Sequence, residues 1–155
     1  MSAYYFATSA LVKRYVAEVG SAWVRNVIAR PSGHVIYAAL IAQAEAISAL
    51  QRKVRDGDLE EDRARTLFRR VTTHFAHSYV LVAITPQVVT QACELLQHHP
   101  LRAYDALQLA CAVGVRGRIQ QNGLPAPIFV AADDILLAAA TAEGFTVDNP
   151  LLYPG

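Results

Sequence analysis

Short apolar runs alternate with helical segments along the whole chain, and this alternation constrains the fold more than any other feature of the sequence. Each run is a few residues long and rich in β-branched or aromatic side chains, which is typical of strands buried on both faces. The runs expected to form strands are residues 3–7, 34–37, 79–84, 128–131 and, as an edge strand, 145–147. Strands separated by helices predict a fold of the α/β class, with a central parallel sheet of about four or five short strands and helices on both faces.

Helical periodicity fills most of the intervals between these runs. Helices are expected at residues 10–17, 21–30, 39–55, 87–98, 102–116 and 134–143. Another is expected after Asp58, which resembles a capping box with Glu61, because apolar residues between Ala64 and Phe75 recur at helical spacing. Thr85 is expected to cap the helix that follows it. The sequence contains no internal repeat and no linker, so it predicts a single domain over residues 1–155.

The composition narrows the classes of protein that this sequence can encode. A net charge of +1 lacks the strong positive charge of many nucleic-acid-binding domains, so any phosphate contact must come from local basic patches. The longest apolar stretches, such as residues 35–42, are far shorter than the roughly 18 residues of a membrane span. No amino-terminal segment resembles a secretion signal. We therefore expect a soluble, cytoplasmic protein with no membrane partner.

The apolar content is high for a soluble chain, since 54% of the residues are hydrophobic. Two interpretations remain open. Either the core is large for the size of the chain, or part of the surface is apolar and is covered by a partner. The second interpretation is slightly favoured.

Three carboxylates have apolar neighbours in the sequence, where an ionised group is costly unless a cation or hydrogen bonds compensate it. They are Glu45, Asp105 and Asp133. Asp105 has an alternative role in the helix dipole and Asp133 has one as a helix cap, whereas Glu45 is expected in the middle of a helix, where it can serve no cap. Ligands of parallel sheets gather at the carboxyl ends of strands, which here are positions 7–9 and 131–134.

Clustered oxygen ligands without nearby histidine or cysteine favour Mg²⁺ or Mn²⁺ over zinc. Such ions bind phosphates and activate water for phosphodiester cleavage, so the residues indicate metal-assisted phosphoryl transfer. A phosphoacceptor domain of the response-regulator type also has acidic strand ends. It requires a lysine at the end of its last strand, which this sequence lacks.

Four segments of the sequence together resemble the motifs of PIN-domain proteins of the VapC toxin type. They are residues 5–15, 43–50, 101–110 and 129–139, which occur in the order and at the spacing of that family. The resemblance implies a PIN-like fold and a Mg²⁺- or Mn²⁺-dependent endoribonuclease, the toxin of a toxin–antitoxin pair. It also implies a homodimer that acts on RNA and is held inactive by a peptide of its cognate antitoxin.

The resemblance also implies roles for individual residues of the catalytic site. Glu45, Asp105 and Asp133 match the metal ligands of the family. Ser9 matches the small hydroxyl residue that supports the site, and Thr8 accompanies it.

Contacts to RNA are expected at Lys13, Arg14 and Arg52, because these residues lie on the helices that carry positions 8–9 and Glu45. Asn149 is aligned with a further polar position near the carboxyl terminus. The sequence does not indicate which RNA is cut or which antitoxin is bound.

The family places an aspartate at the end of the first strand, where this sequence has Ala7. Loss of even an outer partner of a metal site typically costs about 10–100-fold, so we expect catalysis by this chain to be impaired. Two explanations remain open: a deliberate replacement, or a natural non-catalytic protein that uses the PIN fold to bind RNA or a partner peptide. The three retained carboxylates favour replacement, because they are costly in apolar surroundings.

Overall fold

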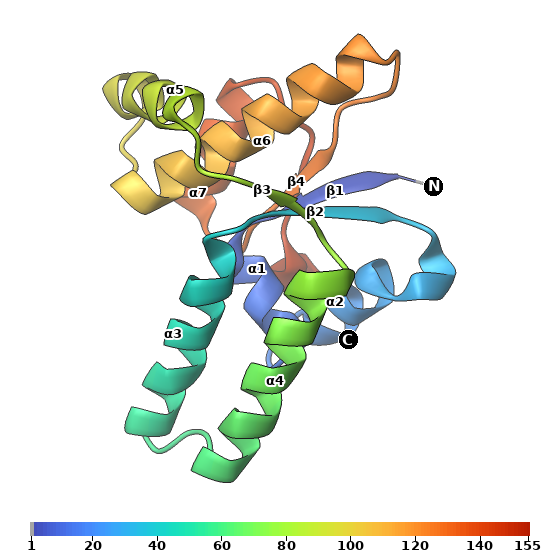
Figure 1. Cartoon of the computed structure of the whole chain (residues 1–155), viewed down its shortest axis with the longest axis vertical. Helices are drawn as coiled ribbons and strands as arrows, with labels where there is room; N and C mark the ends of the chain where they lie inside the picture. Colours follow the sequence, from blue (N-terminus) through green and yellow to red (C-terminus); the bar gives the residue numbers. More distant parts are fainter. Residues whose placement is uncertain (1) are drawn as a thin grey trace.

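The computed structural model describes residues 2–155, which contain a five-stranded sheet with the strand order β3-β2-β1-β4-β5 (Figure 1). The strands are β1 (Ala3–Phe6), β2 (Val35–Ala39), β3 (Val80–Val82), β4 (Ile128–Val130) and β5 (Val147–Asp148). Every neighbouring pair is parallel. The predicted α/β class and its central parallel sheet are therefore confirmed.

Helices cover both faces of this sheet. They are α1 (Thr8–Leu11), α2 (Ser21–Ile28), α3 (Ala42–Arg55), α4 (Glu61–His77), α5 (Pro86–His98), α6 (Ala103–Gln121) and α7 (Asp134–Ala142), with 3₁₀ turns η1 (Val12–Arg14), η2 (Arg30–Ser32) and η3 (Pro150–Leu152). Helices α5, α6 and α7 lie on one face and α1 to α4 on the other, where α3 and α4 form a hairpin that extends beyond the sheet (Figure 1). Within residues 2–155, no helix combines the length and apolarity that crossing a bilayer requires.

Strand β2 is longer than the sequence predicted, and this moves the start of α3. Ala39 pairs with Val82 of β3, so the strand continues past the predicted end at residue 37. Helix α3 then begins at Ala42 instead of residue 39, which places Glu45 in its first turn. The prediction that Glu45 lies in the middle of its helix was therefore wrong, and the positive end of the helix dipole is close to its carboxylate.

The predicted N-cap of α5 is confirmed, whereas the predicted capping box at Asp58 is not formed. Thr85 Oγ1 accepts a hydrogen bond from the Val88 N–H, as predicted for α5. The backbone N–H of Asp58 instead donates to the Lys53 carbonyl, which ties Asp58 to the end of α3. Helix α4 begins at Glu61, with Glu60 as its N-cap residue and no side-chain cap.

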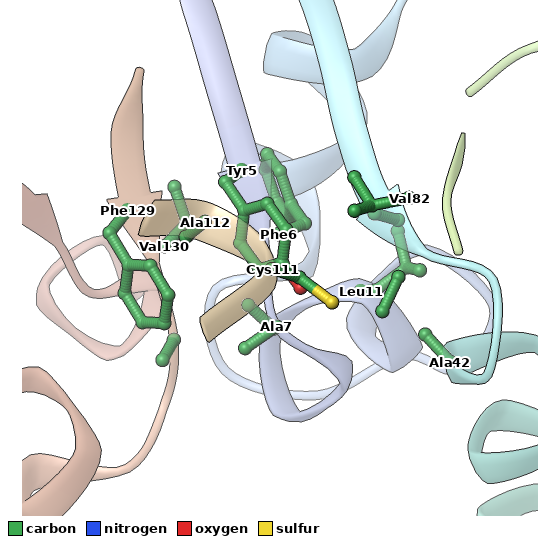
Figure 2. Packing of buried hydrophobic residues seen from close by; sticks show 14 of the residues in the cluster. Tyr5, Phe6, Ala7, Leu11, Ala42, Val82, Cys111, Ala112, Phe129 and Val130 are labelled. Carbon is green, nitrogen blue, oxygen red and sulfur yellow. The ribbon is translucent and has the colours of Figure 1, made fainter. Parts of the chain in front are cut away.

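Strand β1 is the centre of the sheet and of the hydrophobic core (Figure 2). Tyr5 and Phe6 are fully buried, and the Tyr5 ring stacks on Phe129 of β4 at a centroid distance of 5.5 Å. Cys111 of α6 packs over the same strand. Because β1 has a neighbour on each side and a helical layer on each face, its carboxyl end at residue 7 lies in the middle of the molecule.

A chain of hydrogen bonds links η1 to the end of α4. Arg14 Nη1 donates to Tyr79 Oη at 2.7 Å, Tyr79 Oη lies 2.7 Å from Tyr15 Oη, and Tyr15 Oη lies 2.8 Å from His74 Nδ1. Tyr15 and Tyr79 are buried. These four side chains, which we call the tyrosine relay, hold the turn after α1 against the carboxyl end of α4.

The tyrosine relay predicts a specific dependence of stability on pH. Burial, followed by the positive charges of Arg14 and Arg70, lowers the pKa of His74 to about 4. A histidine in the unfolded chain titrates near about 6.5, so the unfolded chain binds more protons than the folded chain between these two values. The free energy of unfolding is therefore highest above this window and falls as the pH drops through it.

Urea denaturation at a series of pH values measures this effect. His74→Gln removes the titrating group but keeps a hydrogen-bond acceptor for Tyr15, so its stability should depend less steeply on pH. His98→Gln, on the exposed surface of α5, is the matched control and should keep the original slope. The same slope in His74→Gln as in the unaltered chain would contradict the prediction.

The carboxyl-terminal segment packs against the start of α2. Gly20 precedes this helix with φ of 89°, and a Cβ atom on it would lie 2.7 Å from Pro150 Cβ. The ring of Tyr153 stacks on Trp23 with a centroid distance of 4.7 Å and an interplanar angle of 2°. Gly20 therefore allows η3 to approach α2 closely enough for this stack to form.

Candidate functional site

A cleft of about 490 Å³ opens at the carboxyl ends of β1 and β4. This is the point where the chain connections of the sheet reverse direction, because β2 and β3 follow on one side of β1 and β4 and β5 lie on the other. Ligands of doubly wound sheets bind at such points. The polar residues that line the cleft are Thr8, Ser9, Glu18, Glu45, Arg52, Arg102, Tyr104, Asp105, Gln108 and Asp133.

Asp133 both caps a helix and lines the cleft. Its Oδ1 accepts hydrogen bonds from the N–H groups of Ile135 at 2.9 Å and Leu136 at 3.0 Å, so the predicted cap of α7 is confirmed. Its second oxygen, Oδ2, has no hydrogen-bond partner among residues 2–155. The cap therefore leaves one carboxylate oxygen available to a ligand.

Asp105 and Glu45 each lie in the first turn of their helix, α6 and α3, and both are half-buried. Burial is the largest cause that raises the pKa of Asp105. The negative charges of Asp133 and, more weakly, Glu45 raise it further, whereas the positive charge of Arg102 lowers it. Asp105 is thus repelled by both of the other carboxylates, and a bound cation would relieve this repulsion.

Ala7 lines the same cleft as these carboxylates and is 1% exposed. Its N–H donates to the Val130 carbonyl at 2.9 Å, which fixes the end of β1 beside β4. It is also the N-cap residue of α1, with φ of −70° and ψ of 157°, and its methyl group cannot accept a hydrogen bond. Aspartate is among the best N-cap residues and alanine among the poorest, so the backbone at position 7 would suit an aspartate better than the alanine that is present.

Two hydroxyl groups after Ala7 hold the walls of the cleft together. Ser9 Oγ accepts a hydrogen bond from the Ala132 N–H at 3.0 Å, which joins α1 to the loop before Asp133. Thr8 Oγ1 accepts a hydrogen bond from Gln108 Nε2 at 2.9 Å, which joins α1 to α6. Both residues thus support the geometry of the site from the position that the sequence indicated.

The sequence did not identify Gln108, which is 1% exposed and organises the floor of the cleft. Its Oε1 accepts from Tyr5 Oη at 2.8 Å, and its Nε2 donates to Thr8 Oγ1 and to Tyr104 Oη, both at 2.9 Å. Burial raises the pKa of Tyr104 to about 12. The signal that could have identified Gln108 is an amide between two leucines, Leu107 and Leu109, on an apolar helix.

Gln108→Leu is expected to lower the free energy of unfolding by about 1–3 kcal/mol, because it leaves buried hydroxyl groups without their partner. Gln120→Leu is the matched control, since Gln120 lies on the same helix and is exposed. Urea denaturation of both variants measures the difference. Equal stability of the two variants would show that the network contributes nothing.

The basic residues predicted to contact RNA are placed differently from one another. Arg52 lines the cleft. Lys13 is buried and its Nζ pairs with Glu18 Oε1 at 3.2 Å. Arg14 belongs to the tyrosine relay and is not among the residues of the cleft. The structure thus brings only Arg52 of the three to the cleft wall, together with Arg102, which sequence reasoning did not select.

Asn149 also lies outside the set of cleft residues. Its Oδ1 accepts a hydrogen bond from the Leu151 N–H at 2.9 Å and so caps η3. The role of Asn149 in this structure is therefore that of the N-cap of η3.

The donors of the cleft suit a hard divalent cation in kind but not in number. Carboxylate and hydroxyl oxygens are the ligands that Mg²⁺ and Mn²⁺ prefer. Within residues 2–155, however, no three His, Cys, Asp or Glu side chains converge closely enough to hold a metal ion as they stand. Ala7 lines the same cleft at the end of β1, and its methyl group offers no donor atom to a metal ion.

The fold and the cleft define an α/β protein with a carboxylate-lined site at the switch point of its parallel sheet. Residues 4–140 match the model of the PIN domain family, so the chain belongs to this family, whose members are in general nucleases. No curated protein matches the chain.

Two solved structures share the fold. The chain is similar to VapBC2 from Rickettsia felis, bound to a DNA fragment from its promoter, with a TM-score of 0.60 and 12% identity over 95% of this chain and 98% of the other. It is similar to FitAcB from Neisseria gonorrhoeae with a TM-score of 0.59 and 16% identity over 94% and 96%. At these identities the likeness extends to the fold alone.

Proposed function

We propose that this chain is a toxin endoribonuclease of the PIN domain family whose metal site lacks one carboxylate. The observation that carries the proposal is the position of Ala7, which is buried and lines the same cleft as the three carboxylates. A nuclease family, an acidic cleft and an N-cap backbone that suits aspartate all support the same function.

Glu45, Asp105 and Asp133 are the residues that we propose as metal ligands, with Mg²⁺ or Mn²⁺ as the ion. Such an ion supplies water activation and neutralises charge on a scissile phosphate. The protein contributes the rest: Ser9 holds the Asp133 loop against α1, and Arg52 at the cleft wall contacts the RNA backbone.

A cognate antitoxin and a second copy of the chain are the partners that we propose. The family resemblance of the sequence implies both. The similarity in fold to the VapBC2 and FitAcB assemblies supports the antitoxin as a partner.

RNA cleavage by the unaltered chain and by its Ala7→Asp variant tests the proposal. Both proteins are incubated with a panel of structured RNAs and Mg²⁺ or Mn²⁺, with EDTA as the metal-free control. Ala76→Asp, an exposed position on α4, is the control for adding a carboxylate elsewhere. We expect cleavage by the Ala7→Asp variant to exceed that of the other two proteins by at least about 10–100-fold.

A second candidate function is a non-catalytic PIN-fold module that binds RNA or a partner peptide. It is favoured by the lack, within residues 2–155, of a group of three side chains placed to hold a metal ion. Metal binding by the Ala7→Asp variant without any cleavage of RNA would select this second function over the first.

A further inference from the structure

A second pocket, which we call the basic pocket, shares no lining residue with the acidic cleft. Its lining residues come mainly from the end of α2, the segment that leads into β2 and the carboxyl end of α4. Figure 1 shows where these elements lie in the fold. The basic pocket encloses about 700 Å³, within the range of roughly 300–1,000 Å³ that is usual for ligand sites. The charged and titratable residues that line it are Arg14, Arg30, His34, His74 and His77. No aspartate or glutamate of the described chain is among the lining residues.

The arginines of the basic pocket have no anionic partner within the molecule. Among residues 2–155, no carboxylate lies within the 4.0 Å of an ion pair from Arg14 or Arg30. Arg14 uses one nitrogen for Tyr79 and retains its other donors, and Arg30 is exposed. The positive charge of the pocket is therefore uncompensated.

The hydrogen bond of His34 fixes which of its ring nitrogens carries the proton. The backbone N–H of Ser2 donates to His34 Nδ1 at 3.1 Å, so Nδ1 is an acceptor. In the neutral ring the proton must then reside on Nε2, which becomes a donor.

The tyrosine relay occupies one ring nitrogen of His74. Tyr79 accepts from Arg14, because a guanidinium can only donate, whereas either hydroxyl can be the donor between Tyr79 and Tyr15. Tyr15 Oη lies 2.8 Å from His74 Nδ1, and the tautomer of His74 decides which of the two donates. The other ring nitrogen, Nε2, has no hydrogen-bond partner among residues 2–155. The relay therefore leaves His74 Nε2 available to a ligand at the wall of the basic pocket.

We infer that the basic pocket binds a phosphate ester, carried by an RNA strand or by a free nucleotide. The pocket is lined by two guanidinium groups and by His34, whose Nε2 carries a donor N–H, and the oxygens of a phosphate accept such hydrogen bonds. Arginine forks match the paired oxygens of a phosphate. Ile28 and Ile36 line the same pocket and provide an apolar wall for the organic part of the ester. The inference depends on neither the metal site nor nuclease activity.

Histidine NMR shifts and fluorescence anisotropy of the full chain in EDTA test the inference, since RNA cleavage is then suppressed. The probes are inorganic phosphate, a nucleoside 5′-monophosphate, a short single-stranded RNA without terminal phosphates, and a glutamate-rich peptide. We expect the phosphate-containing probes to shift the signals of His34 and His74 and to compete with one another. Nucleotide binding as tight as that of RNA identifies a free nucleotide as the ligand, and much tighter binding of RNA identifies the strand.

Arg30→Gln is the decisive variant, because Arg30 is exposed and the described residues offer its side chain no hydrogen bond, while its backbone carbonyl still accepts from the Gly33 N–H. It should weaken binding of the preferred probe by about tenfold or more. Arg118→Gln, an exposed position on α6, should leave binding unchanged. Unshifted histidine signals, unchanged affinity in Arg30→Gln, or tighter binding of the peptide than of any phosphate would each overturn the inference.

Discussion

In the Ala7→Asp background, Asp133→Asn is expected to lower metal-dependent RNA cleavage by about 100-fold or more, since even the loss of an outer partner costs about 10–100-fold. The free energy of unfolding should hardly change. Asparagine is as good an N-cap as aspartate and keeps the oxygen that accepts from Ile135 and Leu136. The substitution removes the negative charge and replaces the free oxygen Oδ2 with an NH2 group, which cannot bind a cation.

Asp134→Asn is the control for this experiment, because Asp134 is the adjacent carboxylate and is exposed. It should keep both cleavage and Mn²⁺ affinity. Single-turnover cleavage, Mn²⁺ binding by calorimetry and urea denaturation separate the two roles of Asp133. If Asp133→Asn cleaves RNA as fast as its parent, Asp133 is a helix cap and nothing more.

Gly20→Ala is expected to destabilise the fold by at least about 2 kcal/mol, because strained backbone conformations alone cost on the order of 1–3 kcal/mol. With φ of 89° at this position, an added side chain is strained whatever the surroundings. The new Cβ would also press against the backbone of Pro150 and push η3 away from α2. The stack between Trp23 and Tyr153 should open as a result, which changes the fluorescence of the single tryptophan.

Gly33→Ala separates the two causes of this loss. Gly33 has a similar φ of 70°, but a Cβ there would meet no atom within 4 Å. Its cost should be that of the backbone conformation alone, about 1 kcal/mol. Equal urea denaturation midpoints for the two variants would mean that the approach of Pro150 to α2 contributes nothing to stability.

The sequence predicted the strands and most helices well, because these depend on local patterns. Apolar runs marked the strands, and the caps at Thr85 and Asp133 were readable from the residues beside them. Glu45, Asp105 and Asp133 were also recognisable, since each is a charge among apolar neighbours, whereas Glu18, which lines the same cleft, was not selected. The local pattern was misleading at Asp58. Its backbone N–H is hydrogen-bonded to the Lys53 carbonyl at the end of α3, so Asp58 is tied to the end of that helix and does not cap the next one.

What the sequence did not indicate depends on partners that are distant along the chain. Gln108 meets Thr8 across 100 positions, and Arg14 meets Tyr79 across 65. The sequence pattern of one helix does not show which side chain of another element will contact it. For the same reason Lys13 and Arg14 were expected to contact RNA, and only the fold revealed that each is bonded within the protein.

The pairing of β1 with β4 also sets the order in which the protein can be completed during synthesis. Tyr5 of β1 pairs with Phe129 of β4, so the floor of the cleft needs strands from the beginning of the chain and from its last third. A nascent chain grows from its amino terminus, and contacts of such long sequence separation form late. Until β4 and Asp133 have been synthesised, the acidic cleft lacks the side that Asp133 and Leu136 line. Nascent chains that end before Asp133 therefore cannot form the complete cleft.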